Sequence, residues 1–217
     1  MTETPAALPR ETYRHGDLRQ ALLTAGLELA REGGPSAVVL REATRRVGVS
    51  PNAAYRHFAD RHALLAAVSA SAQGQVADSM LAAAASASAP TGAGDDPASA
   101  ARRRMRAVGT GYLRFAREQP GLFRTAFSVP DDLARSGDAS KAGVAGLTPL
   151  QVLSASLDEL ESTGVLPPER RQGAELLAWS AVHGLGMLVI DGPLRGLTEE
   201  MIDGATQRLL DMVERGI

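Results

Sequence analysis

The chain lacks cysteine altogether, so no disulfide, thiolate nucleophile or cysteine-ligated zinc site is available to its 217 residues. It also lacks any sustained alternation of aromatic or β-branched residues with polar ones, which argues against a β-sheet. What recurs instead is an apolar residue every three to four positions. This spacing predicts an all-α fold.

Membrane and export signals are missing too. The first residues, MTETPAALPRETYRHGDL, contain no apolar core of the kind that a secretory signal needs. The longest apolar run, Leu176 to Ile190, is shorter than a membrane span and is interrupted by His183. We therefore expect a soluble cytoplasmic protein with no membrane partner.

Positive charge is unevenly placed along the chain. The formal net charge is −2, and the chain has one lysine, Lys141. Residues 1–62 nevertheless hold nine arginines against seven acidic residues, together with three of the four histidines, whereas the remainder is acidic. A mildly basic first segment on an acidic body indicates that the partner at one end is anionic.

Capping residues and helix breakers divide the chain into helices. Asp17 is expected to cap the first helix, which Gly33-Gly34-Pro35 ends, and Asp60 is expected to cap the fourth. The segment Ser86–Ala100 has no apolar periodicity and is expected to be a loop between two domains or two long helices. The other expected helices cover Leu40–Val47, Pro51 to near Phe58, Ala101–Glu118, Leu122 to Phe127, Pro149–Ser162, Pro168–Ile190 and Thr198–Arg215.

The stretch GVSPNAAYRHFADRHAL, residues 48–64, has the order of a helix-turn-helix. Gly48 allows the chain to reverse after one helix, and Ser50-Pro51 is a favourable start for the next. In such a motif the second helix enters a DNA major groove. We expect Ala54 and Phe58 to face the core, and an ordinary buried helical corner is the alternative.

The sequence from Tyr13 to Val68 closely resembles the DNA-binding domain of the tetracycline-repressor (TetR) family of bacterial regulators, most specifically between Leu40 and Phe58. The resemblance implies three N-terminal helices that form a DNA-reading head, a fourth that links it to a larger ligand-binding and dimerisation bundle, and a homodimer on a palindromic double-stranded operator. The corresponding divisions are a flexible arm at 1–12, a helix-turn-helix domain at 13–62 and an effector-binding body at 63–217.

The resemblance also implies roles for individual residues of the head. Asn52 is the one side chain at the leading end that can bond an adenine bidentately, while tyrosine, histidine and arginine donors suit phosphate oxygens. Val39 and Thr44 depart from the family pattern, in which threonine and alanine are frequent. The expected DNA contacts are Arg41, Ser50, Pro51, Asn52, Ala53, Tyr55, His57 and Arg61.

The body offers a shorter resemblance. The segment AWSAVHGLGML, Ala178 to Leu188, resembles a TetR-type C-terminal domain recognised by its Trp, His and Gly, here Trp179, His183 and Gly184. Aromatic residues in the body are either ordinary core or the wall of an effector pocket. The residues expected to line such a pocket are Tyr112, Phe115, Phe123, Phe127, Trp179 and His183.

Catalysis has little support in the sequence. His183 has no second ligand at metal-binding spacing, Gly184 and Gly186 lack the further glycine and preceding strand of a dinucleotide site, and no serine lies in a nucleophile elbow. We expect no enzyme activity, no cofactor and no metal. The favoured function is a DNA-binding repressor released by an unidentified small molecule. The alternatives are a helical small-molecule-binding protein or enzyme that retains the head, and a protein that uses the corner to contact another protein.

Overall fold

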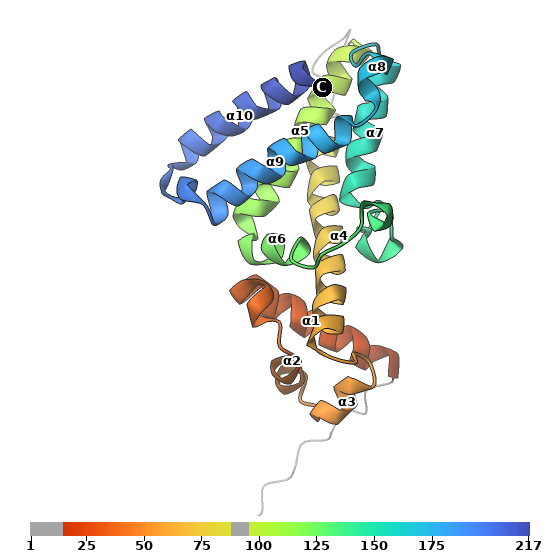
Figure 1. Ribbon diagram of the computed structural model, residues 1–217, viewed down its shortest axis with the longest axis vertical. Coiled ribbons are helices and arrows are strands. Elements are labelled where there is room, and N and C mark those ends of the chain that lie inside the picture. The colour runs from red at the N-terminus through yellow and green to blue at the C-terminus, as the bar shows by residue number, and fades with distance from the viewer. Residues whose placement is uncertain (1–14, 88–95) are drawn as a thin grey trace, which may run out of the picture.

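The computed structural model describes residues 15–87 and 96–217, which are helical and contain no strand. Figure 1 shows an elongated molecule with a small head at one end and a larger helical body at the other. The predicted all-α fold is confirmed. The predicted arm at residues 1–12 lies outside the described residues.

The head consists of three helices and one 3₁₀ turn: α1 (His15–Gly33), η1 (Gly34–Ala37), α2 (Leu40–Val47) and α3 (Pro51–Tyr55). Apolar side chains at helical spacing meet in its centre, and their burial stabilises the packing of the three helices. The buried residues include Leu22, Leu29, Val38, Ala43, Ala54 and Phe58.

One long helix, α4 (Arg61–Ala87), joins the head to the body (Figure 1). The carboxylate of Asp60 accepts a hydrogen bond from the backbone N–H of Ala63 at 2.8 Å, so the predicted N-cap is confirmed. Leu64 and Val68 on the inner face of α4 are fully buried. The same helix therefore belongs to the core of both parts.

The body packs six further α-helices around the second half of α4: α5 (Pro97–Glu118), α6 (Pro120–Ala126), α7 (Pro149–Ser162), α8 (Pro168–Arg171), α9 (Ala174–Ile190) and α10 (Glu199–Gly216). Three 3₁₀ turns lie between them, at Leu133–Arg135 (η2), Ala139–Lys141 (η3) and Pro193–Gly196 (η4). Within the described ranges, no helix is long and apolar enough to cross a lipid bilayer.

Several predicted helix ends need correction. Helix α1 begins at His15, so Asp17 lies in its first turn instead of capping it. Helix α4 extends to Ala87, and α5 begins at Pro97 after Asp96, whose carboxylate accepts from a backbone N–H in the first turn. The short side chains near the end of α4 and the start of α5 are compatible with a helix and give no clear signal of where each helix stops. The loop predicted at Ser86–Ala100 is therefore too long.

The helix predicted from Pro168 to Ile190 is wrong, because two helices occupy this range. Helix α8 ends at Arg171, and α9 begins at Ala174. Between them Gly173 has a φ of +80°, a left-handed conformation that glycine adopts without steric cost. The chain therefore turns between the two helices.

The segment between α6 and α7 is fastened to α4. Lys141, the chain's one lysine, is only 5% exposed. Its ammonium group donates hydrogen bonds to the Asp131 carboxylate and, at 2.6 Å, to the Arg135 carbonyl oxygen. The backbone N–H of Val144 donates to the Asp78 carboxylate of α4 at 2.8 Å. The Lys141 contacts brace the segment internally, and the hydrogen bond to Asp78 holds it against α4.

Candidate functional site

The turn between α2 and α3 is closed by two backbone hydrogen bonds. Gly48 has φ +75° and ψ 28°. Its N–H donates to the carbonyl oxygen of Arg45 at 3.3 Å, and the N–H of Val49 donates to that of Thr44 at 3.0 Å. This is the Schellman arrangement, which ends a helix at a glycine in the left-handed region. The chain then reverses and starts α3 at Pro51.

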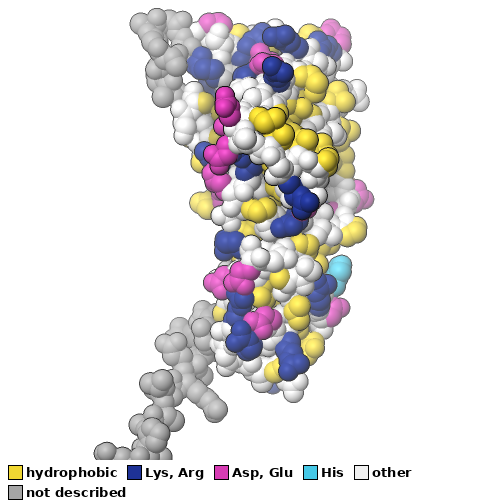
Figure 2. Space-filling view, turned by 90° about the vertical axis from the view of Figure 1, so that its left-hand side faces the viewer, with side chains coloured by type: hydrophobic (Ala, Val, Ile, Leu, Met, Phe, Trp, Pro, Cys, Tyr) yellow, Lys and Arg dark blue, Asp and Glu magenta, His cyan; other side chains and the backbone are white. Residues whose placement is uncertain are grey.

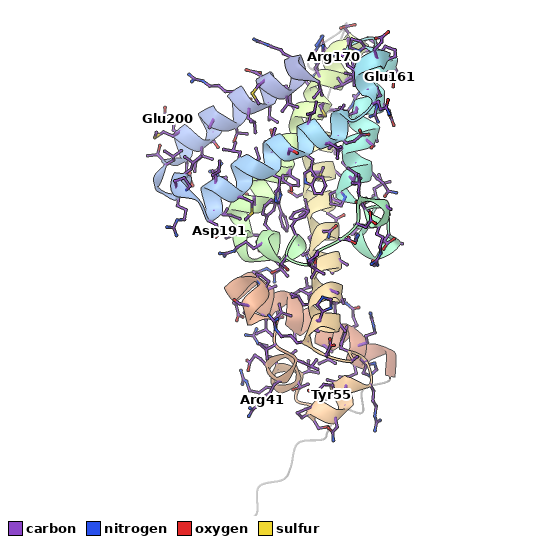
Figure 3. All side chains as sticks on the ribbon, viewed as in Figure 1. Arg41, Tyr55, Glu161, Arg170, Asp191 and Glu200 are labelled. Atoms are coloured by element: carbon purple, nitrogen blue, oxygen red, sulfur yellow. The ribbon has the colours of Figure 1, made fainter. Side chains whose placement is uncertain are left out.

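Helix α3 presents its leading residues to the outside. Ser50 stands at the N-cap position with an exposed side chain that caps no backbone N–H, and Pro51 and Asn52 are exposed after it. Tyr55 is 56% exposed. Figure 3 shows Tyr55 and Arg41 near the end of the head that lies away from the body.

Helix α3 is shorter than predicted, since it ends at Tyr55 and not near Phe58. The chain continues in a tighter turn, in which the N–H groups of His57 and Phe58 both donate to the carbonyl oxygen of Ala54 at 2.9 and 3.0 Å. Ala54 and Phe58 are buried, as predicted, while Ala53 and His57 are half-buried. The buried pair fixes which side of α3 faces outward.

The start of α2 lies beside the leading end of α3. Arg41 is exposed, and its carbonyl oxygen accepts a hydrogen bond from the Thr44 hydroxyl at 2.7 Å. Thr44 is buried, and this hydrogen bond satisfies its hydroxyl group. An alanine at this position would have no hydroxyl group to donate. Val39 is 40% exposed at the N-cap of α2, where its side chain can offer no hydrogen bond.

Ion pairs with glutamates neutralise part of the positive charge of the head. The Arg46 guanidinium pairs with Glu32 at 2.6 Å, and the Arg45 guanidinium pairs with Glu42 at 2.7 Å. Hydrogen bonds from these arginines lower the pKa of both glutamates. Within the described residues no ion pair involves Arg41 or Arg56, so their charge is available to an anionic partner.

Arg61 has an internal role that the sequence did not reveal. Its Nε donates to the Val38 carbonyl oxygen at 2.8 Å, and one terminal nitrogen donates to that of Pro35 at 2.7 Å. Arg61 thereby ties the start of α4 to the segment before α2. His62 beside it is exposed, as expected.

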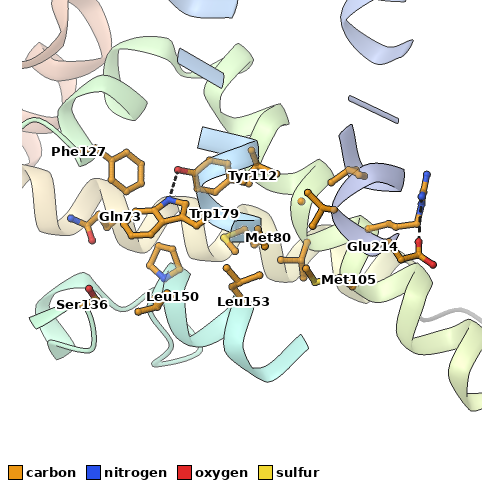
Figure 4. Close-up of a pocket in the computed structure, with 18 residues that line it drawn as sticks. Gln73, Met80, Met105, Tyr112, Phe127, Ser136, Leu150, Leu153, Trp179 and Glu214 are labelled. Atoms are coloured by element: carbon orange, nitrogen blue, oxygen red, sulfur yellow. Dashed lines mark hydrogen bonds and ion pairs between the residues drawn. The ribbon is translucent and has the colours of Figure 1, made fainter. Parts of the chain in front are cut away.

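A cavity lies in the body between α4, α5, α7, α9 and α10, with about 760 Å³ of empty space, its opening to solvent included. Figure 4 shows Phe127, Gln73 and Trp179 at one end of the cavity and Met105 and Glu214 at the other. Most of the wall is aliphatic, with Met80, Met105, Val108, Leu153, Val182 and Leu210 among its residues. Such a composition is typical of a small-molecule site.

An outer hollow adjoins the aromatic end of this cavity and shares Gln73, Phe127, Ser136 and Trp179 with it. We call this hollow the mouth. It adds His183 from α9 and the two acidic residues Asp131 and Asp132 from the segment after α6. The cavity thus has an aliphatic interior and a more polar entrance.

Three side chains form a hydrogen-bonded chain between α5 and α9. The Trp179 indole N–H donates to the Tyr112 hydroxyl oxygen at 3.1 Å, and that hydroxyl lies 2.9 Å from His183 Nδ1. Because the Tyr112 oxygen already accepts from Trp179, its own proton is best given to Nδ1, which leaves the imidazole proton on Nε2. Burial lowers the pKa of His183 and raises that of Tyr112, so both groups are uncharged at neutral pH.

The structure brings four of the six expected pocket residues to the cavity or its mouth. Tyr112, Phe127 and Trp179 line the cavity, and His183 lines the mouth. Phe123 is fully buried behind them, with its ring centroid 5.2 Å from that of Tyr112. Phe115 lies three positions after Tyr112, about 60° short of a full helical turn, and it is buried in the core. Phe115 and Phe123 are therefore core residues and do not line the cavity.

The aliphatic wall could not be predicted from the sequence. Met80, Met105 and Leu210 come from three helices, and their apolar side chains are indistinguishable in sequence from those of an ordinary core. Gln73 and Ser136 also line the cavity, and nothing in their local sequence separates them from surface residues. Only the fold places these five side chains around one space.

Two family descriptions match this chain. The tetR family of bacterial regulatory proteins matches residues 22–68, which include the turn and α3. The tetracyclin repressor-like C-terminal domain matches residues 105–213, which include most of the cavity wall. Among proteins of curated function, none matches at a significant level.

Solved structures share the whole architecture. A protein of unknown function from Rhodococcus sp. RHA1 aligns with a TM-score of 0.68 at 25% identity, over 96% of this chain and 99% of that one. The TetR family transcriptional regulator PfmR from Thermus thermophilus aligns with a TM-score of 0.51 at 20% identity, over 90% of this chain and 98% of that one. The similarity of fold extends from the head to the last helix.

Proposed function

Since this chain belongs to the tetR family of bacterial regulatory proteins, we propose that it is a repressor that binds a palindromic operator as a homodimer and is released by a small molecule. Family membership makes it a DNA-binding transcription regulator and not an enzyme. We assign DNA binding to residues 13–62 and effector binding and dimerisation to residues 63–217. Its place of action is then the cytoplasm, where bacterial DNA lies.

The observation that carries the proposal is the outward face of α2 and α3. Asn52 is exposed at the leading end of α3, where its amide would reach an adenine edge. Tyr55 is exposed, and His57 is half-exposed beyond the helix end; both would hold phosphate oxygens. The remaining contacts that we propose come from Arg41, Ser50, Pro51, Ala53 and Arg61.

Arg61 would contribute to DNA binding partly by holding the head in its folded shape. Two of its guanidinium nitrogens already donate to backbone carbonyl oxygens, and a guanidinium has five N–H groups in all. Those that remain can meet a phosphate while the first two hold the segment before α2 in place. We therefore expect replacement of Arg61 to disturb the head as well as its DNA contacts.

The homodimer is argued from the outer faces of α9 and α10. Leu177 and Leu188 are 62% and 44% exposed on α9, and Met201 and Met212 are 55% and 58% exposed on α10. Each pair is eleven residues apart, close to three turns, so its members share one face. Figure 2 shows apolar side chains gathered among charged ones on the side of the body that carries these helices. Burying this face against a second copy would remove it from water.

The effector would act through α6, which lies between the cavity and the head. Phe123 of α6 packs on Tyr112 and, at 5.5 Å between ring centroids, on His183. Two residues earlier in α6, a methyl group on Gly121 would overlap the carbonyl oxygens of Ala30 and Arg31 in α1, so the two helices are in close contact. A ligand that displaced the aromatic residues would favour a dimer whose recognition helices no longer match major grooves about 34 Å apart.

The test is a mobility-shift titration on the DNA upstream of the protein's own coding region, over several sequences and salt concentrations. We expect Tyr55→Phe and His57→Ala to weaken binding to all sequences alike, since phosphate contacts carry no sequence information. Asn52→Ala should chiefly reduce discrimination between operators, by about 1–3 kcal/mol at one base pair.

The matched control is His62→Ala, an exposed histidine that lies outside the proposed contacts and should leave binding unchanged. An Asn52→Ala protein with full discrimination would remove this residue from base readout. A wild-type protein with no salt-dependent affinity for any DNA would contradict the repressor proposal itself.

A further inference from the structure

We infer that the effector is an uncharged, mainly apolar molecule whose planar ring carries a hydrogen-bond acceptor and lies at the aromatic end of the cavity, with an aliphatic part directed inward. This inference rests on the proposed role of the body as the effector-binding part. It follows from the order of side chains along the cavity, from the pairing of its charges and from the donor that faces its mouth.

The wall changes character from one end to the other. Trp179 and Phe127, with ring centroids 6.0 Å apart, stand at the mouth end together with Tyr112. Flat rings in this setting favour stacked or edge-on contact with another planar group. Toward the other end the wall is formed by flexible or branched aliphatic side chains such as Met105 and Leu210, which suit an alkyl chain.

The charged side chains in the interior of the cavity are already paired. Arg106 is the one cationic residue of the cavity wall in the described chain, and its guanidinium binds Asp211, Glu214 and Gln207. At the mouth, the Asp131 carboxylate is bound by Lys141. An ionised group inside the cavity would therefore lose its hydration without gaining a counter-charge. At the mouth the Asp132 carboxylate, which accepts a hydrogen bond from the Ala134 N–H, would oppose an anion further.

A hydrogen-bond donor remains at the mouth. The Tyr112 hydroxyl lies 2.9 Å from His183 Nδ1, and we assign the hydroxyl proton to this hydrogen bond because the Tyr112 oxygen already accepts from Trp179. The imidazole then carries its own proton on Nε2, for which the described residues provide no hydrogen-bond partner. His183 lines the mouth beside Trp179 and Phe127. A carbonyl or similar oxygen attached to the ring of the ligand would accept this proton.

Four probes that share a benzene ring with a para pentyl chain separate these requirements. They differ only in the group opposite the chain: 4-pentylacetophenone has a neutral acceptor, 1-ethyl-4-pentylbenzene has none, 4-pentylbenzoate is an anion and 4-pentylbenzylammonium is a cation. Trp179 is the chain's one tryptophan, so its fluorescence reports binding at the cavity of the full-length protein.

The expected order places 4-pentylacetophenone first. The ethyl analogue should bind about three- to tenfold more weakly, because it loses one hydrogen bond, and both ions should bind at least about tenfold more weakly. His183→Phe should abolish the preference for the ketone over the ethyl analogue, while His183→Gln, which retains an N–H donor, should keep part of it. His62→Phe is the matched control at a histidine outside the cavity and should keep all of it.

Tighter binding of the benzoate or the ammonium probe than of the ketone would overturn the inference, as would an unchanged ketone preference in His183→Phe. Absence of any fluorescence response to all four probes would also overturn it, while leaving DNA binding to be judged by the mobility-shift titration. Conversely, a protein that prefers the ketone but binds no DNA would retain this inference about the cavity and lose the proposed function.

Discussion

At the scale of single residues, two tyrosines of this chain have opposite surroundings. Tyr112 is 2% exposed and bridges Trp179 and His183 through its hydroxyl. Tyr55 is 56% exposed and its hydroxyl has no hydrogen-bond partner among the described residues. The same chemical group is therefore structural in the body and available to a partner in the head.

We predict that Tyr112→Phe lowers the free energy of unfolding by about 1–2 kcal/mol, because it leaves the partly buried Trp179 N–H and His183 Nδ1 without their shared partner. Urea denaturation followed by circular dichroism measures this change. Tyr55→Phe is the matched control and should leave stability within about 0.5 kcal/mol of the wild type. Equal stability losses in the two variants would refute the distinction.

At the scale of helices, local sequence signals decided what could be predicted. The bounds of α2 and α7 were predicted correctly. Gly48 ends α2. Thr148-Pro149 begins α7, where Thr148 and Gln151 form a capping box. The break at Gly173 was missed because one glycine within an apolar helical pattern does not distinguish a turn from a tolerated helix residue. A glycine's φ depends on the packing around it, which the sequence does not display.

The candidate site divides in the same way. The outward face of α3 could be predicted because Ala54 and Phe58 mark its inner side and a short helix leaves few alternatives. The cavity could be predicted only through its aromatic residues. Phe115 and Phe123 were expected at the pocket but do not line this cavity, and Met105, which does, was not expected there. Burial against the core and burial around a cavity select the same residue types.

We predict that Gly48→Ala lowers the free energy of unfolding by about 1–2 kcal/mol, since an alanine in the left-handed region brings its Cβ against its own backbone. The surroundings do not add to this cost, because a Cβ at Gly48 would meet nothing within 4 Å. Gly48→Asn is the control, and it should cost less because asparagine tolerates this region. Thermal or urea unfolding compares the three proteins, and an alanine variant as stable as the wild type would exclude strain at the turn.

At the scale of the whole molecule, the body has two distinct apolar regions. One is the core around α4 and the cavity, and the other is the outer surface of α9 and α10, where five large apolar side chains are exposed in the single chain. An exposed face of this kind is typical of an interface between subunits. We therefore propose that the second region is the interface between the two copies of the dimer.

We predict that Leu177→Glu weakens self-association by at least about tenfold, because a carboxylate would have to be buried without a partner in the interface. Sedimentation velocity over a range of protein concentrations measures the change. Val144→Glu is the matched control, since Val144 is 96% exposed on the segment between α6 and α7. A protein that sediments as a monomer before any substitution would refute the proposed interface.

The single lysine has a consequence for how this regulator can be controlled. Lys141 is buried beneath its own segment, and every cationic side chain among residues 15–87 is an arginine or a histidine. Lysine acetylation, which removes positive charge from many DNA-binding surfaces, therefore has no target on the described part of the head. An arginine keeps its charge throughout the physiological pH range. In the homodimer that we propose, DNA affinity would instead be controlled by the spacing of the two heads.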